Sequence, residues 1–133
     1  MSLIQDITRD LEHLNAGTIH ALAEKAGEGS LRALMDVIKE RYRQIAEEGW
    51  TPEHDDTHVN GEMAKVATCY TFTASSTDTI REVFGAGEPP PTWPDDWDSA
   101  WWKPTDRRRA LVKAAALILA EIERLDRSKG GAS

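Results

Sequence analysis

The chain has 133 residues, of which 40% are hydrophobic and 29% are charged, and these ordinary values predict one globular domain and exclude global disorder. Its 16 lysines and arginines against 23 aspartates and glutamates give a formal net charge of −7, which opposes nonspecific attraction to nucleic acid or to an anionic membrane. Because the single cysteine excludes an internal disulfide, and no apolar run reaches the ~20 residues of a membrane-spanning helix, we expect a soluble cytoplasmic protein.

The first 29 residues are predicted to form two short helices. Ser2 and Gln5 have the spacing of a capping box, and apolar residues follow at helical intervals up to Leu14. Thr18 is then expected to cap a second helix, which Gly27 ends.

The clearest helix of the first half begins at Ser30. Its apolar residues recur every three or four positions, so we expect the resulting stripe to face the core: Leu31, Leu34, Met35, Ile38, Tyr42 and Ile45. Gly49 and Pro52 are expected to end this helix, with Trp50 packed against its last turn.

The densest polar chemistry lies between Trp50 and Tyr70. One of Asp55, Asp56 and Thr57 is expected to cap a helix with the core stripe Val59, Met63, Val66 and Tyr70. A second line of side chains runs beside this stripe: His58, Glu62, Lys65 and Cys69. His58 and Glu62 lie one helical turn apart. They form either a structural ion pair or the protein half of a metal or nucleotide site, and His54 and Asp55 would add ligands to such a site. The zinc motif His-Glu-x-x-His is absent, and Cys69 is expected to be a small buried residue.

Helix signals weaken after Thr71. One or two helical turns are predicted from Asp78 to Phe84, and the prolines from Pro89 to Pro91 then forbid helix. Four tryptophans follow within about ten residues, Trp93, Trp97, Trp101 and Trp102, and such rings either cover the helical core or face a partner. The acidic residues between them would favour a partner with a basic rim.

The last helix is predicted from Asp106 to Arg127, with Thr105 or Asp106 as its cap. Its apolar arc is wide enough for the central helix of a bundle: Leu111, Val112, Ala115, Ile118, Leu119, Ile122 and Leu125. Arg107, Arg108 and Arg109 occupy the first turn, where positive charge opposes the helix dipole. We expect Asp95, Asp96 and Asp98 to compensate these arginines, with a phosphate-bearing ligand as the alternative.

Two strings carry a family resemblance. GWTPEHDDTHVNGE and WWKPTDRRRALVKAAALILAEIERLDR resemble a group of small proteins encoded by tailed phages and prophages, over about residues 37–127. The resemblance implies an accessory protein of a mobile element and supplies no catalytic residue. The chain is also similar to the all-helical nucleoside triphosphate pyrophosphohydrolases of the MazG type, which bind Mg²⁺ through two pairs of acidic residues. Glu123 and Asp126 match the second pair, whereas Lys65 stands where Glu62 would need its partner carboxylate.

These observations predict an all-α fold, a single-domain bundle of four to six helices with the Trp/Pro-rich loop packed across it. Residues 1–29 would be an N-terminal helical extension, 30–127 the core and 128–133 a frayed tail. The leading functional prediction is a phage or prophage accessory protein in the host cytoplasm. It would bind a host or phage macromolecule, a protein rather than nucleic acid or membrane, through the four clustered tryptophans.

The alternative prediction is a metal-dependent nucleotide pyrophosphohydrolase-like enzyme with an incomplete set of carboxylates. In that case Arg107, Arg108 and Arg109 would receive phosphate. Mg²⁺ or another divalent ion would be held by residues from two helices: His54, Asp55, His58, Glu62, Glu123 and Asp126.

Overall fold

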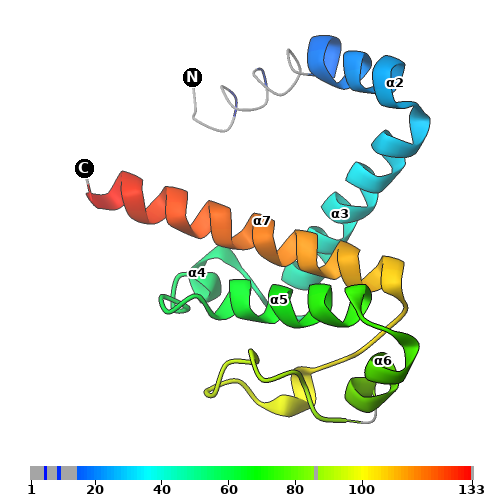
Figure 1. Ribbon diagram of the computed structural model, residues 1–133. Helices are drawn as coiled ribbons and strands as arrows, with labels where there is room; N and C mark the ends of the chain where they lie inside the picture. Colours follow the sequence, from blue (N-terminus) through cyan, green and yellow to red (C-terminus); the bar gives the residue numbers. More distant parts are fainter. Residues whose placement is uncertain (1–4, 6–8, 10–14, 86, 133) are drawn as a thin grey trace. The chain divides into compact units, whose positions relative to one another are not determined.

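The protein is all-α, as predicted. The structure, a computed structural model, describes residues 5, 9, 15–85 and 87–132, and within these it contains six α-helices, labelled α2 to α7, and no strand (Figure 1). The chain divides into two compact units, Met1–Asp36 and Val37–Ser133. No helix in the described ranges combines the length and the apolar content needed to cross a membrane.

The first unit contains a π-helical turn at Asn15–Ile19, then α2 (His20–Ala26) and the beginning of α3 (Glu28–Ala46). Gly27 separates the two α-helices with a φ of 87°, and its N–H donates to the Ala23 carbonyl at 2.9 Å. The predicted stop at Gly27 is therefore confirmed. Thr18 lies inside the helical turn and is not a cap, and the helix expected up to Leu14 falls outside the described residues except for Gln5 and Arg9.

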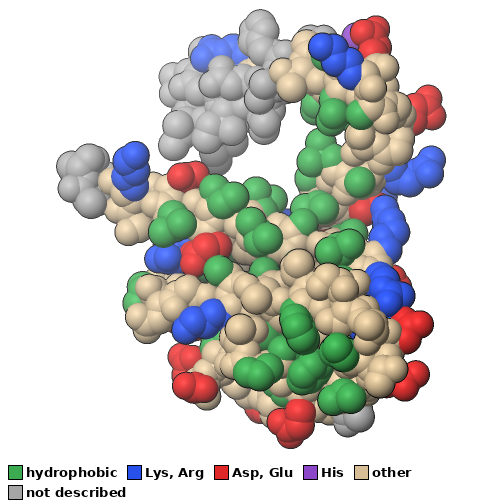
Figure 2. Space-filling model, viewed as in Figure 1, with side chains coloured by type: hydrophobic (Ala, Val, Ile, Leu, Met, Phe, Trp, Pro, Cys, Tyr) green, Lys and Arg blue, Asp and Glu red, His purple; other side chains and the backbone are tan. Residues whose placement is uncertain are grey.

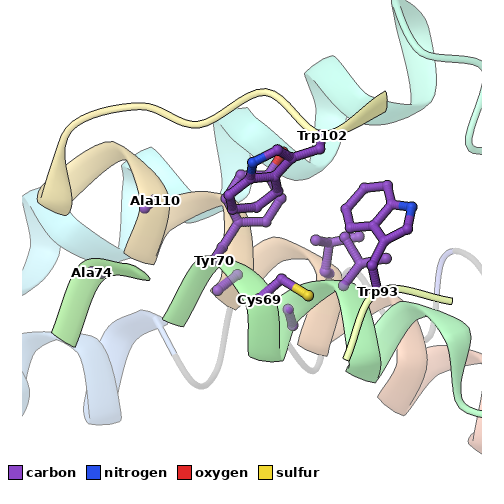
Figure 3. Packing of buried hydrophobic residues seen from close by; sticks show 10 residues of the cluster. Cys69, Tyr70, Ala74, Trp93, Trp102 and Ala110 are labelled. Carbon is purple, nitrogen blue, oxygen red and sulfur yellow. The ribbon is translucent and has the colours of Figure 1, made fainter. Parts of the chain in front are cut away.

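The core of the second unit lies between α5 (Glu62–Ser75) and α7 (Arg107–Ala132), which run alongside each other (Figure 1). Met63, Val66 and Tyr70 of α5 are buried as predicted, whereas Val59 precedes the helix and is exposed. Small residues dominate the facing side of α7, where Ala110, Ala114 and Leu117 are buried (Figure 3). Alanines at these positions let the two helix backbones approach closely.

The Trp/Pro-rich loop covers this core, as predicted for two of its four tryptophans. Trp93 and Trp102 are 9% and 5% exposed, and the Trp102 ring lies 4.7 Å from that of Tyr70 (Figure 3). The indole N–H groups of these two rings have carbonyl acceptors, since Trp102 donates to Phe84 of α6 (Asp78–Gly85) and Trp93 donates to Trp97. A short 3₁₀ turn, Ser99–Trp101, precedes Trp102.

Cys69 is fully buried beneath the loop, which confirms the sequence prediction. Its Sγ lies 3.0 Å from the Thr92 hydroxyl, and burial raises the pKa of the thiol.

The predicted core face of α7 is wrong for most of its large residues. Leu111, Ile118, Ile122 and Leu125 are each about half exposed, while Val112 is buried as expected. The helix is rotated so that Ala110, Ala114 and Leu117, and not Leu111, Ile118 and Ile122, face α5. Helix α7 extends to Ala132, five residues past the predicted end at Arg127.

The predicted core-facing stripe of α3 is also wrong. Leu34, Met35, Ile38 and Tyr42 are all exposed, between 41% and 72%. The buried positions of this helix are polar: Glu40, Arg41 and Gln44. A buried charge is stable only when it is paired, so these residues must be held by partners from other elements.

Candidate functional site

The polar stretch after α3 forms two helices and not one, a short α4 and a longer α5. Thr51 caps α4 (Pro52–Asp55), its Oγ1 accepting from the His54 N–H at 3.2 Å, with Pro52 in the first turn. Helix α5 begins only at Glu62, because Gly61 takes a left-handed conformation with a φ of 78°. The predicted caps at residues 55–57 are therefore wrong, and the Glu62 carboxylate instead accepts from the Asn60 N–H at 2.8 Å.

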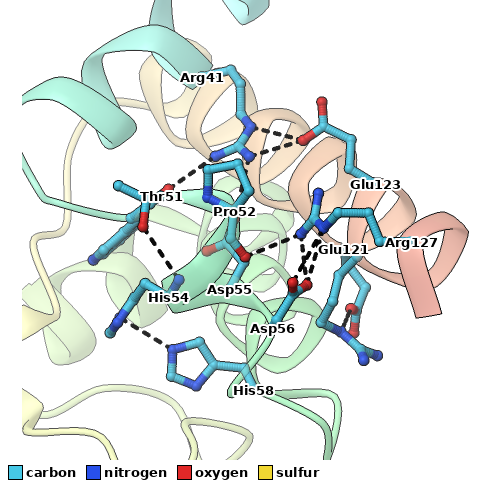
Figure 4. A network of polar contacts seen from close by, with 12 residues as sticks. Arg41, Thr51, Pro52, His54, Asp55, Asp56, His58, Glu121, Glu123 and Arg127 are labelled. Carbon is cyan, nitrogen blue, oxygen red and sulfur yellow. Dashed lines mark hydrogen bonds and ion pairs between the residues drawn. The ribbon is translucent and has the colours of Figure 1, made fainter. Parts of the chain in front are cut away.

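Arg41 is the centre of a buried polar network that joins three helices (Figure 4). Its guanidinium donates to Glu123 of α7 at 2.8 and 3.1 Å, to Asp55 of α4 at 3.2 Å and to the Trp50 carbonyl at 3.3 Å. Asp55 is only 1% exposed, and its burial raises the pKa of the carboxyl while the charge of Arg41 acts in the opposite direction. A second pair, Arg127 with Asp56 at 2.8 Å, ties α7 to the end of α4.

The proposed metal ligands fall into separate groups. His58 Nδ1 lies 3.3 Å from Glu62 Oε2, so the predicted pair forms, and its Nε2 lies 3.3 Å from His54 Nε2 (Figure 4). Asp55 and Glu123 instead share Arg41, and the remaining candidate, Asp126, is exposed on α7. Across the described residues, no three His, Cys, Asp or Glu side chains are placed to hold a metal ion. A guanidinium stands between the two carboxylates that a divalent cation would need.

Arg107 and Arg109 at the start of α7 pair with carboxylates, but not with the expected aspartates. Arg107 pairs with Asp78 at 2.9 Å and donates to the Ser76 carbonyl, and Arg109 pairs with Glu40 of α3. Burial acts to raise the pKa of Glu40, but hydrogen bonds from Arg43 and the charge of Arg109 outweigh it, so the pKa is lowered. Asp98 accepts instead from the Ala100 N–H and caps the 3₁₀ turn.

A pocket of about 470 Å³ lies where the Trp/Pro-rich loop meets the end of α3 and α4. Trp50 forms its centre, with its ring centroid 5.9 Å from that of Trp97 and 6.0 Å from that of Trp101. We call these three rings and the space between them the indole pocket. The pocket is lined by aromatic, imidazole and acidic side chains: Glu48, Gly49, Trp50, His54, His58, Asp96, Trp97, Asp98 and Trp101.

The indole pocket already has a cation at its edge. Lys103 Nζ lies 5.7 Å from the centroid of the Trp101 ring and 3.7 Å from a carboxylate oxygen of Glu48. Trp101 is 41% exposed, so its ring is accessible to a molecule from outside. The buried Trp93 supports the Trp97 ring, which packs edge-on against it with the two ring centroids 6.1 Å apart.

The sequence indicated part of this pocket. It identified His54, His58, Trp97 and Trp101 as candidates, but for different sites, a metal centre and a partner surface. It assigned Trp50 only to packing, and Glu48 to no role. The composition of the two segments that carry these residues, 50–58 and 93–102, drew attention to each of them separately. That the two segments meet depends on the path of the loop, which no local sequence pattern specifies.

Comparisons of the chain with protein-family models, with curated proteins and with solved structures find no match. The resemblance to phage and prophage proteins therefore stays a prediction from sequence. The functional conclusion depends on the geometry of the indole pocket and of the network around Arg41.

Proposed function

We propose that the protein acts by binding a partner protein, and that it does so by enclosing a lysine or arginine side chain of that partner in the indole pocket. The observation that carries this proposal is the composition of the pocket, in which three indole rings stand next to three carboxylates, Glu48, Asp96 and Asp98. The face of an indole ring attracts a cation, by ~0.5–1 kcal/mol at an exposed site and ~2 kcal/mol or more where water is excluded.

The charges favour a cation over an anion. Asp96 and Asp98 are acidic residues that line the pocket, and the net charge of −7 would attract a basic surface from a distance. Lys103 already uses one face of Trp101 in the same way, which supports the view that this ring accepts a cation. A phosphate group at this position would meet the carboxylates and be repelled.

The partner best suited to this pocket is a host or phage protein with exposed basic side chains. The choice of a host or phage protein rests on the resemblance of the chain to accessory proteins of mobile elements. The proposal keeps the Trp/Pro-rich loop as the recognition element, with Trp97 and Trp101 in contact with the partner and Trp93 and Trp102 holding the loop on the core.

The alternative, a metal-dependent nucleotide pyrophosphohydrolase, requires at least three carboxylates that converge on an ion such as Mg²⁺. Within the described residues, Asp55 and Glu123 bind Arg41, and Glu62 is engaged at the start of α5. No observation here favours that activity over cation recognition.

The test uses a Gly/Ser-rich peptide that carries several arginines and the same peptide with uncharged citrulline in their place. Titration is followed through the indole N–H signals of the protein by NMR, which detects weak binding. We expect the arginine peptide to shift the signals of Trp50, Trp97 and Trp101, and the citrulline peptide to shift them far less. Trp101→Leu should weaken binding roughly 3- to 30-fold, the size of one cation–indole contact.

A matched pair of charge variants separates the pocket from the general acidity of the chain. Asp96→Asn with Asp98→Asn removes two charges from the pocket, and the asparagine at position 98 can still cap the 3₁₀ turn. Asp95→Asn with Glu88→Gln removes two charges from exposed positions that do not line the pocket. Equal weakening by both pairs, or equal binding of the citrulline peptide, would contradict the proposed recognition.

A further inference from the structure

One narrow strip of α7 is both apolar and exposed. Leu111, Ile118, Ile122 and Leu125 are 50%, 47%, 50% and 52% exposed, and Figure 2 shows hydrophobic side chains lying open along this helix. Ala115 completes a spacing of four, three, four and three residues. We call these five residues the α7 seam. A strip of this width and spacing is typical of a helix that packs along one other helix in a coiled coil.

The other sides of α7 already have partners. Ala110, Ala114 and Leu117 are buried with α5 in the core, and Arg109 and Glu123 pair with Glu40 and Arg41 of α3. The seam lies between these two flanks and extends for about two heptads. All five of its residues are apolar, where a helix side facing water would carry polar residues.

We propose that the α7 seams of two copies of the chain pack against each other in antiparallel orientation and form a homodimer. In this register Leu111 faces Ile122 of the second copy, and Ala115 faces Ile118, so that a small residue stands opposite a large one. Alternation of that kind lets two helices interdigitate without a void.

The charges of α7 favour the antiparallel orientation over the parallel one. The first turn of the helix carries Arg107, Arg108 and Arg109, and the exposed Asp126 lies near its other end. An antiparallel pair brings Asp126 of each copy close to the basic first turn of the other, and it also opposes the two helix dipoles. A parallel pair would place the six arginines of the two first turns side by side.

The seam is a continuous apolar surface. Leu111, Ile118, Ile122 and Leu125 each leave about half of their surface open, so these side chains supply the apolar centre of an interface whose standard size is ~800 Å² per partner. The contact uses none of the residues of the indole pocket, so it does not depend on the proposed function.

Sedimentation analysis of the full chain at micromolar concentrations tests the dimer. We expect twice the 14.8 kDa of one chain for the wild type, and 14.8 kDa for Ile118→Lys with Ile122→Lys. Because both side chains are half exposed in the single chain, circular dichroism should show unchanged helix content. The matched control, Val59→Lys with Val83→Lys, changes two residues of similar exposure outside the seam and should stay dimeric. A wild type that is monomeric throughout, or a dimer that persists in the seam variant, would overturn the proposal.

Oxidative cross-linking tests the orientation independently of those lysine variants. In the antiparallel register the two copies of residue 118 lie about 4.5 Å apart along the helix axis, whereas the two copies of residue 125 lie about 26 Å apart. Ile118→Cys should therefore form a covalent dimer and Leu125→Cys should not. Linking by both variants would indicate a parallel pair. If neither variant cross-links, and Ile118→Lys lowers the stability of a chain that is monomeric, another part of the same chain covers the seam. Either result overturns the proposed dimer.

Discussion

A guanidinium group keeps its charge at any pH a protein experiences, so a buried arginine must be matched by anions and acceptors. Arg41 meets this requirement with Asp55, Glu123 and the Trp50 carbonyl, which come from three different parts of the chain. The position of α4 and the position of Trp50 in the indole pocket are thereby linked to one side chain of α3. Asp55 depends on Arg41 more than Glu123 does, because the Asp55 side chain is almost fully buried while the Glu123 side chain reaches solvent.

Replacement of Arg41 should be among the most damaging single changes in the second unit. Arg41→Met removes the charge and leaves Asp55 buried without its partner, so we expect a loss of ~3–5 kcal/mol in the free energy of unfolding, measured by urea denaturation. Adding Asp55→Asn to that variant should recover part of the loss. Lys39→Met, an exposed cation of the same helix, should change stability by less than ~0.5 kcal/mol. An equal, small effect of both single changes would show that the network does not hold the fold.

Tyr70 provides a second prediction for a single residue. Burial raises the pKa of its phenol to about 12, although the Lys103 N–H donates to the oxygen and acts in the opposite direction. Because the pKa is higher in the folded state than the ~10 of an unfolded tyrosine, this group stabilises the fold fully below pH ~10, and the contribution is lost as the pH rises to about 12.

The measurement is an ultraviolet titration of tyrosinate in the Tyr42→Phe variant, which leaves Tyr70 as the reporting residue. We expect ionisation near pH 12 in the folded protein and near pH ~10 in urea. A folded-state midpoint near 10 would mean that water reaches the phenol, and the loop that carries Trp102 would then not seal the core.

At the scale of the elements, periodicity predicted where the helices lie but not which way they face. On α7 the large residues Leu111, Ile118 and Ile122 form a better hydrophobic stripe than Ala110, Ala114 and Leu117, yet the second set is buried. A stripe in the sequence is recognised by its large side chains, whereas close approach of two helices favours small ones, and the second effect decides the contact with α5. The same limit applied to α3, where buried charges are satisfied by residues distant in sequence.

The facing of α7 can be tested by removing methyl groups. Leu117→Ala should leave a cavity between α5 and α7 and cost ~2–5 kcal/mol in urea denaturation, because this side chain is 1% exposed. Val59→Ala, at a residue the sequence also placed in the core, should cost less than ~0.5 kcal/mol since it is 63% exposed. A larger loss of stability for Val59→Ala than for Leu117→Ala would support the helix orientation that the sequence predicted.

At the scale of the whole molecule, helical periodicity predicted the all-α fold class, and the density of polar residues singled out a segment that lines the indole pocket. The segment from Trp50 to His58 does line the indole pocket. What the sequence could not supply is the opposite wall, because Trp97 meets Trp50 across 47 positions and lies in a proline-rich segment, residues 87–98, without regular secondary structure. Similarly, Glu123 was chosen as a metal ligand from its spacing to Asp126, whereas in the fold it neutralises Arg41.

Because Cys69 is buried, its reaction with a thiol reagent can report how often the second unit opens. The thiol is the only one in the chain, it is inaccessible in the closed state, and Pro90 and Thr92 of the loop lie over it. A thiol reagent can therefore react only while the loop is lifted or the unit is open, so the reaction rate counts those openings. For the same reason, a cysteine introduced at the surface can carry a fluorophore or spin label while the native thiol remains silent, with no need to remove it first.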